Sequence, residues 1–554
     1  MVRASGRDAG EHGTVRRARE AGRGRSWWQD GVLYQVYPRS FADANADGHG
    51  DLRGLIGRLD HLEWLGVGGI WLNPITRSPN ADWGYDVSDY TDVEPDLGTL
   101  TDAEELIERA ARRGIRVILD LVPNHTSERH AWFVDARRDR YALHRGWYVW
   151  ADGRPDDGPP NNWLSVFGGP AWTLDEATGQ YYLHNFLPEQ PDLDWWNDDV
   201  RESFDEILRF WFDRGVAGFR IDVANAIVKD RALRDNLPAT PDDPDRVRRL
   251  GQRQIYNMHR PEVHDVLRRW RRIADGYDPP RILVGETWEH DVAVLATYYG
   301  AQEDELHLAF NFPFALADLD ADALRGVVEA TESQIGMRGW PVWTASNHDI
   351  GRFTTRWCDG DERKARCALT LLLTLRGTPF LYAGDEIALP DGEVERDELR
   401  DPVGIRGWPA DRGRDGGRTP MPWTADGGGF TEPGVRPWLP ARTPPDRSVA
   451  AQRDDPSSTL SFVRRLISRR RDSDDLRAGA YETLPSPPGT WIYRRGRSTI
   501  VALNLSDHRQ RVAAQDLEVV ASTGDEPVRA PHGDVDLGPW EAVVLSRSAG
   551  DSAP

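Results

Sequence analysis

Cysteine and long apolar runs are both scarce in this sequence. Only Cys358 and Cys367 occur among its 554 residues, so no disulfide framework can form, and the two thiols offer no set of metal ligands. No apolar run approaches the roughly 18 residues that are needed to span a membrane. We therefore expect reduced thiols, a cytoplasmic location and no association with a membrane.

Basic residues are also fewer than acidic residues. Lysine and arginine together number 69 against 90 acidic residues, which gives a formal net charge of −21. This charge repels a phosphate backbone, so nucleic acid is not expected as a partner, whereas a neutral substrate is compatible with it. Residues 1–26 are rich in Arg and Gly and lack the apolar core of a secretory signal. We expect them to form a disordered extension.

What the sequence does contain is an alternation of short apolar runs with amphipathic segments. Helices are predicted between most of the runs, for example over Thr101–Arg113 and Val200–Arg214. Eight such units predict a (β/α)₈ TIM barrel of the α/β class. The eight expected strands are Val32–Tyr37, Gly69–Leu72, Arg116–Val122, Gly218–Val223, Ile282–Glu286, Leu306–Phe312, Val342–Ser346 and Pro379–Ala383.

Two stretches depart from the barrel pattern. Residues 126–188, after the third strand, are rich in Gly, Pro, Asp and Trp and are too long for a simple loop, which predicts a small inserted domain B. From about Ala480 the chain turns to short alternating runs, which predict antiparallel strands. The expected organisation is therefore a barrel over 27–125 and 189–470, domain B between its two parts, and a C-terminal β-sandwich over 471–554.

Charged residues gather at the carboxyl ends of the predicted strands, where a barrel places its active site. A single acid there is as often a helix cap or an ion-pair partner, but converging like charges cost stability and need a functional reason. These strand-end residues are Asp120, His125, Arg220, Asp222, Glu286, His348 and Asp349.

Hydrolysis of a glycosidic bond uses a set of this kind. One carboxylate attacks the anomeric carbon, and a second carboxyl group protonates the leaving oxygen. Arg220 lies two residues before Asp222 on the same face of the strand, so we expect it to keep Asp222 ionised as the nucleophile. Nearby negative charge is expected to raise the pKa of Glu286, which suits a general acid. Asp349 is then available to bind sugar hydroxyls.

Four motifs, in order, carry a family resemblance. They are Asp-Leu-Val-Pro-Asn-His at 120–125, Gly-Phe-Arg-Ile-Asp-Val at 218–223, Gly-Glu-Thr-Trp at 285–288 and Asn-His-Asp at 347–349. With them the chain, over about residues 27 to 430, resembles glycoside hydrolase family 13, the α-amylase family, and within it the oligo-1,6-glucosidase/α-glucosidase group. The resemblance implies a retaining mechanism with Asp222 as nucleophile, Glu286 as acid/base and Asp349 as transition-state stabiliser.

The resemblance also implies a closed pocket for the terminal glucose, and hence exo-action. Arg414 resembles the arginine that pairs with Asp82 and closes the far end, with Arg418 as the second choice. Val223, directly after the nucleophile, goes with α-1,6 cleavage in this group, while α-1,4 cleavage stays open. The implied substrate-binding residues are Asp82, Tyr85, His125, Phe167, Gln190, Arg220, His348 and Arg414.

Oxygen-bearing side chains alternate in Asp-Ala-Asn-Ala-Asp-Gly-His-Gly-Asp at 43–51. The pattern begins like an EF-hand loop, but Gly54 stands where the bidentate glutamate belongs, so a complete EF-hand is excluded. The stretch resembles the Ca²⁺ loop of the glucosidase group, and a hydrogen-bonded turn is the alternative. No organic cofactor is expected. The resemblance implies a structural Ca²⁺, with Mg²⁺ as second choice, on Asp43, Asn45, Asp47, Asp51 and the carbonyl of His49.

Other activities occur in this family. A transglycosylating relative, such as a sucrose isomerase or a trehalose synthase, shares the catalytic acids, although the Arg-Leu-Asp-Arg-Asp loop associated with sucrose isomerases is missing here. The heavy chains of amino-acid transporters carry a membrane span and usually lack the acids, and an endo-amylase is disfavoured by the closing pair of Asp82 and Arg414. We expect a hydrolase acting on short oligosaccharides, with a transglycosylase as the alternative. The sequence does not indicate an oligomeric state.

Overall fold

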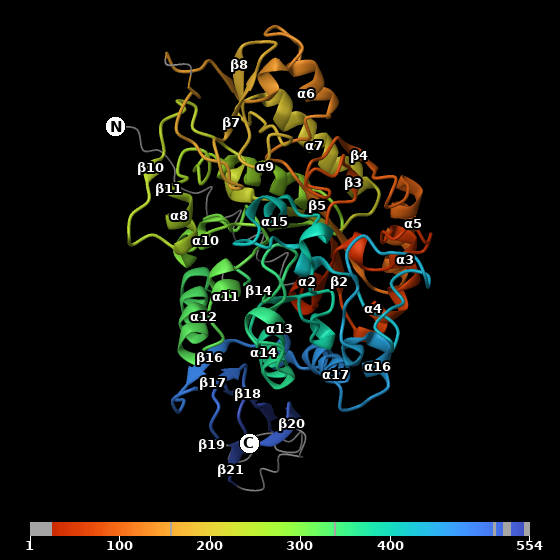
Figure 1. Cartoon of the computed structure of the whole chain (residues 1–554). Helices are drawn as coiled ribbons and strands as arrows, with labels where there is room; N and C mark the ends of the chain where they lie inside the picture. The colour runs from red at the N-terminus through yellow and green to blue at the C-terminus, as the bar shows by residue number, and fades with distance from the viewer. Residues whose placement is uncertain (1–24, 156–157, 337–338, 514–516, 525–532, 548–554) are drawn as a thin grey trace, which may run out of the picture.

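The computed structural model describes residues 25–155, 158–336, 339–513, 517–524 and 533–547 (Figure 1). Residues 1–24, most of the predicted N-terminal extension, lie outside these ranges. Across the described ranges, no helix combines the length and the apolar character that crossing a membrane requires.

Eight parallel strands form the central sheet, in the spatial order β13-β12-β9-β5-β2-β1-β15-β14. The two strands at the ends of this order follow each other along the chain, so the sheet is a nearly closed barrel. All eight predicted strands are confirmed, with ends that differ by at most three residues. They are β1 (Leu33–Val36), β2 (Gly69–Leu72), β5 (Arg116–Leu121), β9 (Gly218–Ile221), β12 (Ile282–Gly285), β13 (Leu308–Ala309), β14 (Val342–Thr344) and β15 (Thr378–Tyr382).

Apolar side chains fill the barrel and the layer outside it. Inward-facing residues such as Leu33, Trp71 and Phe380 form one interior cluster, because side chains alternate between the two faces of a strand. Outside, helices turn an apolar stripe toward the sheet; in α7 it includes Phe204 and Trp211. The longer helices are α5 (Leu100–Arg112), α7 (Asp198–Asp213), α9 (Val263–Asp275), α12 (Ala321–Ile335), α14 (Glu362–Thr374) and α17 (Thr459–Asp472).

Shorter elements connect these units. Two small antiparallel pairs are β3 (Thr76–Arg77) with β4 (Asp89–Val93) and β10 (Leu237–Pro238) with β11 (Gln252–Arg253). The short helices are α2 (Trp27–Asp30), α3 (Leu52–Gly57), α4 (Leu59–Leu65), α6 (Ala131–Ala136), α8 (Asp245–Leu250), α10 (Val292–Thr297), α11 (Phe312–Leu316), α13 (Phe353–Arg356), α15 (Pro402–Gly407), α16 (Val449–Arg453) and α18 (Asp474–Ala478).

The segment between β5 and α7 forms a small sheet of its own. Its antiparallel strands are ordered β6-β8-β7 and surround an apolar cluster that includes Trp163 and Trp172. In Figure 1, β7 and β8 lie at the opposite end of the molecule from the C-terminal strands. The bounds are Trp150–Ala151 for β6, Trp172–Asp175 for β7 and Gln180–Leu183 for β8.

The C-terminal segment is antiparallel, as predicted. A five-stranded sheet has the order β16-β17-β18-β22-β20, and β19 pairs with β21. Val512 and Val535 of the pair share a buried cluster with Ile492 and Leu545 of the larger sheet, so the two sheets pack against each other. The strands are β16 (Tyr481–Leu484), β17 (Thr490–Arg495), β18 (Thr499–Asn504), β19 (Gln510–Ala513), β20 (Glu518–Ser522), β21 (Asp534–Leu537) and β22 (Ala542–Ser546).

Candidate active site

Backbone hydrogen bonds fix the residues that follow strands β9 and β12. The Asp222 N–H donates to the Leu121 carbonyl at 2.8 Å, and the Glu286 N–H donates to the Ile221 carbonyl at 2.9 Å. These bonds continue the ladder of the parallel sheet one residue past each strand end. Both carboxyl groups therefore start from rigid positions at the same end of the barrel.

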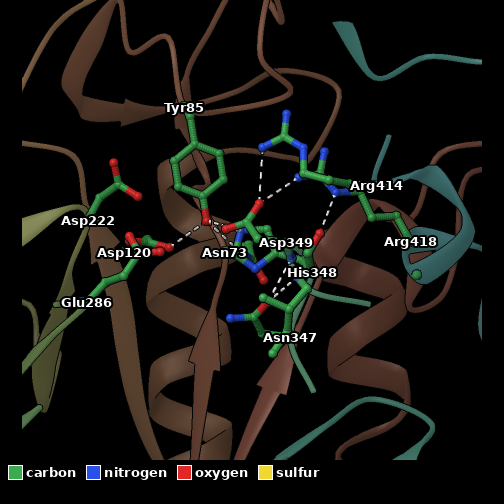
Figure 2. A network of polar contacts seen from close by, with 12 residues as sticks. Asn73, Tyr85, Asp120, Asp222, Glu286, Asn347, His348, Asp349, Arg414 and Arg418 are labelled. Carbon is green, nitrogen blue, oxygen red and sulfur yellow. Dashed lines mark hydrogen bonds and ion pairs between the residues drawn. The ribbon is translucent and has the colours of Figure 1, made fainter. Parts of the chain in front are cut away.

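Arg220 is the centre of a buried cluster of three carboxyl groups. The register of β5 against β9 places Asp120 opposite Arg220. Nη1 of Arg220 lies 2.8 Å from Asp120 Oδ1 and 2.7 Å from Asp222 Oδ1, and Nη2 lies 2.7 Å from Glu286 Oε2. Figure 2 shows the three acids side by side. One guanidinium thus bridges the predicted nucleophile and the predicted acid.

Three carboxyl groups around one guanidinium cannot all be ionised without a large cost. Burial raises the pKa of Asp120 to about 7, against the opposing effect of Arg220. Burial also raises the pKa of Asp222; Arg220 opposes this, whereas the charges of Glu286 and Asp120 add to it. Arg220 therefore favours the ionised form of Asp222, as expected, whereas burial and the two neighbouring acids oppose it.

Val223 adopts a strained backbone conformation between the two acids. Its φ of +34° lies in the left-handed region, which costs a β-branched residue on the order of 1–3 kcal/mol. The turn aims the Val223 N–H at Glu286 Oε2, 2.9 Å away, and Trp288 Nε1 donates to Glu286 Oε1 at 2.9 Å. Fixed donors therefore hold both oxygens of Glu286. Sequence reasoning missed the contact from Trp288.

Asp349 lies among cationic and hydrogen-bonding side chains. Arg414 and Arg418 belong to the segment after β15, and His348 directly precedes Asp349. Its Oδ1 is 3.1 Å from Arg414 Nη1 and 3.1 Å from Arg418 Nη2, and its Oδ2 is 3.2 Å from His348 Nε2. Burial opposes ionisation, but the contacts with His348 and the two guanidiniums hold the pKa of Asp349 well below its usual range. The result is an ionised carboxylate that can accept hydroxyl hydrogen bonds.

The Tyr85 hydroxyl links the carboxyl cluster to His348 (Figure 2). It lies 3.0 Å from Asp120 Oδ2 and 2.6 Å from His348 Nε2, and it accepts a hydrogen bond from Asn73 at 2.8 Å. Gln35 Nε2 lies 2.9 Å from His348 Nδ1 and donates to Asn73 Oδ1 at 2.8 Å. Sequence reasoning missed Gln35 and Asn73, whose only signal is a polar residue within or directly after a buried barrel strand.

Gln190 and His125 extend this network toward domain B. Gln190 Nε2 lies 3.0 Å from His125 Nε2 and 3.4 Å from Asp82 Oδ2. His125 Nε2 also lies 2.9 Å from the Tyr85 carbonyl, and burial lowers the pKa of His125 to about 3. His125 is therefore neutral and acts through hydrogen bonds. Its ring packs on Phe186, with centroids 5.2 Å apart.

Arg414 joins the far end of the network to the segment after β15. Its Nη2 lies 2.6 Å from Asp82 Oδ1 and 2.7 Å from Asp401 Oδ1. The expected pairing of Asp82 is therefore made by Arg414, while Arg418 contacts Asp349 instead. Asp401 was not predicted, although Asp before Pro is a recognisable signal for the cap of helix α15, which it forms. Phe167 also packs near Arg414, 5.5 Å from its guanidinium.

Loop 43–51, the candidate cation site, is held by its own side chains. Asp51 caps α3 by accepting from the Gly54 N–H at 2.7 Å. Within the described part of the chain, no group of three His, Cys, Asp or Glu side chains is arranged as a metal-ligand set. The Asp43 carboxylate accepts from the N–H groups of Asn45, Ala46 and Gly48 and from the hydroxyl of Thr431.

The sequence and the fold are similar to those of several known proteins. Residues 35–479 match the family model described as the catalytic domain of alpha amylase. A probable alpha-glucosidase of Rhizobium meliloti (strain 1021) is 43% identical over 470 residues, which cover 83% of this chain and 85% of that protein. An oligo-1,6-glucosidase of Heyndrickxia coagulans is 36% identical over 528 residues, 87% and 92% of the two chains. The crystal structure of the alpha-glucosyl transfer enzyme XgtA superposes with a TM-score of 0.87 at 39% identity, covering 94% of this chain and 100% of that chain.

Proposed function

Because the chain belongs to the α-amylase family of glycoside hydrolases, we propose that it is a retaining, exo-acting α-glucosidase. Asp222 attacks the anomeric carbon of a terminal α-linked glucose in a short oligosaccharide, and Glu286 protonates the leaving oxygen. Water, deprotonated by Glu286, then hydrolyses the glucosyl ester of Asp222. Asp349 binds sugar hydroxyls while the ring passes through the transition state.

The observation that carries this proposal is the Arg220 bridge. Its Nη1 binds Asp222 and its Nη2 binds Glu286, so the two carboxyl groups are held within the span of one guanidinium. A retaining enzyme needs its two carboxyl groups only about 5–5.5 Å apart, whereas an inverting enzyme leaves room for a water between them.

One set of contacts and one residue identity support the finer parts of the proposal. Arg414 ties Asp82 and Asp349 together at one end of the polar network, which favours a site closed beyond the terminal glucose and hence exo-action. The valine at position 223 favours substrates with α-1,6 bonds, and substrates with α-1,4 bonds are the alternative.

A transglycosylating activity is the second candidate. It is favoured by the close superposition on a structure named as an alpha-glucosyl transfer enzyme. Incubation with maltose, isomaltose, sucrose and trehalose, followed by chromatography of the products, separates the two candidates. Free glucose as the main product supports hydrolysis. Isomerised disaccharides or longer oligosaccharides with little glucose would make transfer the primary activity.

We also propose a structural cation, Ca²⁺ before Mg²⁺, at loop 43–51. Its support is a set of hard oxygen donors, the side chains of Asp43, Asn45, Asp47 and Asp51 with the His49 carbonyl. His49 stacks on Trp438, which stacks on Tyr37 beside His348, so an ordered loop would support the active site. Chelation should lower the melting temperature, and Ca²⁺ should restore it. An Asp47→Ala variant with the same response to chelator as the wild type would contradict the site.

A cytoplasmic location is proposed from the two cysteines. Cys358 and Cys367 are both buried and unpaired. Burial raises the pKa of the Cys358 thiol to about 12, so it is not a reactive thiolate. Unpaired, protonated thiols fit a reducing compartment.

A further inference from the structure

A histidine joins the two loops that carry the catalytic pair. His259 lies on the connection between β11 and α9. Its backbone N–H donates to the Asn225 carbonyl at 2.7 Å, and its Nδ1 lies 2.8 Å from Glu289 Oε1. Asn225 is three residues after Asp222 in the chain, and Glu289 is three residues after Glu286. His259 therefore contacts both catalytic loops and belongs to neither.

Glu289 is a buried carboxylate that accepts two hydrogen bonds on one oxygen. The Tyr298 hydroxyl donates to Oε1 at 2.9 Å, the same oxygen that His259 contacts. Burial opposes the ionisation of Glu289, but the hydrogen bonds from His259 and Tyr298 hold its pKa below the ordinary value. An ionised carboxylate only accepts hydrogen bonds, so Nδ1 of His259 carries the hydrogen and donates it. In its neutral form the ring also accepts at Nε2 from Asn225 Nδ2, 3.3 Å away.

Glu289 closes a tight turn whose central residue is Trp288. The Glu289 N–H donates to the Thr287 carbonyl at 2.8 Å, which is the hydrogen bond of a three-residue γ-turn. The Trp288 N–H donates to Asn225 Oδ1 at 3.4 Å. The Trp288 ring stacks on Phe312, with centroids 3.9 Å apart. Trp288 is therefore held by its ring, by its N–H and by the anchored side chain of the next residue.

Trp288 in turn holds the acid. Its Nε1 donates to Glu286 Oε1 at 2.9 Å, and the Val223 N–H donates to Oε2 of the same carboxyl group at 2.9 Å. A general acid must lie within hydrogen-bond reach of the oxygen that it protonates, and a displacement of about 1 Å lowers a rate about 100-fold. The contacts that fix Trp288 therefore also fix the proton donor.

We propose that His259 is a positioning residue for Glu286. By binding Glu289 and the loop after β9 it holds Trp288, and Trp288 holds the acid where it protonates the leaving oxygen. The proposal rests on the proposed function, because it concerns the step in which Glu286 acts as the acid. The His259 side chain is 32% exposed, so replacing it removes these hydrogen bonds without opening the core.

Two kinds of substrate separate positioning of the acid from a general loss of structure. α-Glucosyl fluoride releases a stable anion without protonation, whereas isomaltose and maltose release a sugar whose oxygen Glu286 must protonate. The measured quantity is kcat/KM for isomaltose, or for maltose where that is the better substrate, divided by kcat/KM for α-glucosyl fluoride. Damage to the fold or to glucose binding lowers both values and leaves their ratio unchanged.

His259→Leu should lower this ratio about tenfold or more in the full-length enzyme, because the acid loses its fixed position. The same loss is expected of His259→Ala, which adds no bulk. His259→Asn should bring the ratio back close to the wild-type value, because its amide can donate to Glu289 and asparagine tolerates the φ of +54° at this position. Trp288→Phe should lower the ratio as well, and adding His259→Leu to it should lower it no further, since both act through one hydrogen bond.

His264→Leu is the matched control. His264 is also a half-buried histidine, and it contacts the buried carboxylate of Glu305 at 2.5 Å. Because this pair lies outside the contacts to Glu286, the variant should keep the wild-type ratio. Circular dichroism checks the folding of every variant.

Two failures can be told apart. A wild-type ratio in His259→Leu and His259→Ala, or a further full loss when His259→Leu is added to Trp288→Phe, would overturn the positioning role and leave the glucosidase assignment standing. Absence of glucose release by the wild type from α-glucosyl fluoride, isomaltose and maltose would overturn the proposed function itself.

Discussion

Asp222 shares the guanidinium of Arg220 with two other carboxyl groups, and this arrangement affects its pKa. Arg220 contacts Asp120, Asp222 and Glu286 within 2.8 Å. In the proposed mechanism Asp222 acts as an ionised nucleophile and Glu286 donates a proton to the leaving oxygen. The contacts of Arg220 therefore place the proposed nucleophile beside the proposed proton donor.

Asp222→Asn should abolish the reaction while the protein stays folded. The amide cannot form the ester, so kcat should fall on the order of 10⁴-fold. The fold should persist because the change removes one buried negative charge and leaves two carboxyl groups on Arg220. Steady-state kinetics on isomaltose and maltose, with circular dichroism as a check of folding, measure both effects.

Asp194→Asn is the matched control, because it makes the same chemical change at another acid of the barrel. It should keep near-normal turnover. Wild-type kcat in Asp222→Asn would remove Asp222 from the nucleophile role.

Val223→Thr should move linkage preference from isomaltose toward maltose. The threonine hydroxyl would lie beside the nucleophile. One added contact there should change the ratio of two kcat/KM values about tenfold. The readout is the isomaltose-to-maltose ratio, with Val228→Thr as a control at a buried valine of the same segment. An unchanged ratio would mean that Val223 does not determine the linkage.

At the scale of elements, Arg414 ties the segment after β15 to the rest of the site. It contacts Asp82 before β4, Asp349 after β14 and Asp401 at the start of α15. Asp82 and Asp401 are buried, so they depend on this guanidinium for charge balance.

Arg414→Gln should therefore loosen the segment and weaken substrate binding. Leaving buried carboxylates unpaired costs about 3–5 kcal/mol of stability, and KM should rise more than kcat falls. Arg412→Gln, on the same segment but packed on Trp408, is the control. Equal KM values for the two variants would show that the Arg414 contacts do not shape the site.

The barrel strands and the strand-end acids could be predicted because both depend on local sequence. Apolar runs define the strands, and a barrel brings their carboxyl ends together. Contacts between distant segments could not be predicted in this way: the contacts of Val223 with Glu286 and of Gln35 with His348 arise only when the barrel closes. The pairing of Arg414 with Asp82 came from family resemblance, because no local pattern links residues 332 positions apart.

The effects that oppose the ionisation of Asp222 could not be predicted from the sequence, for a related reason. The spacing of Arg220 and Asp222 is visible in the sequence, but the degree of burial and the number of acids sharing one guanidinium are not. Burial disfavours the charged form and here outweighs the single cation.

For the whole molecule, the buried acids should give stability a measurable pH dependence. Asp120 has a folded pKa of about 7, raised from 3.8. Its contribution to stability is therefore present below about pH 4 and is lost as the pH rises toward 7. Asp349, with a lowered pKa, acts in the opposite sense, because its contribution is present above its ordinary pKa and is lost as the pH falls through its folded value.

Asp120→Asn should therefore gain stability relative to the wild type between about pH 4 and pH 7. The gain is at most about 4 kcal/mol, since one pKa unit corresponds to about 1.4 kcal/mol. Urea denaturation at several pH values measures it, with exposed Asp60→Asn as the control. A constant difference between Asp120→Asn and wild type across this range would show that Asp120 does not titrate there.

The central claim is that the molecule is a retaining α-glucosidase, and the anomeric form of the first glucose released tests it most directly. Proton NMR during the first minutes of isomaltose or maltose hydrolysis distinguishes α-glucose from β-glucose before the two interconvert. Two displacements, first by Asp222 and then by water, predict that α-glucose appears first. β-Glucose as the initial product would contradict the covalent intermediate and the roles of Asp222 and Glu286.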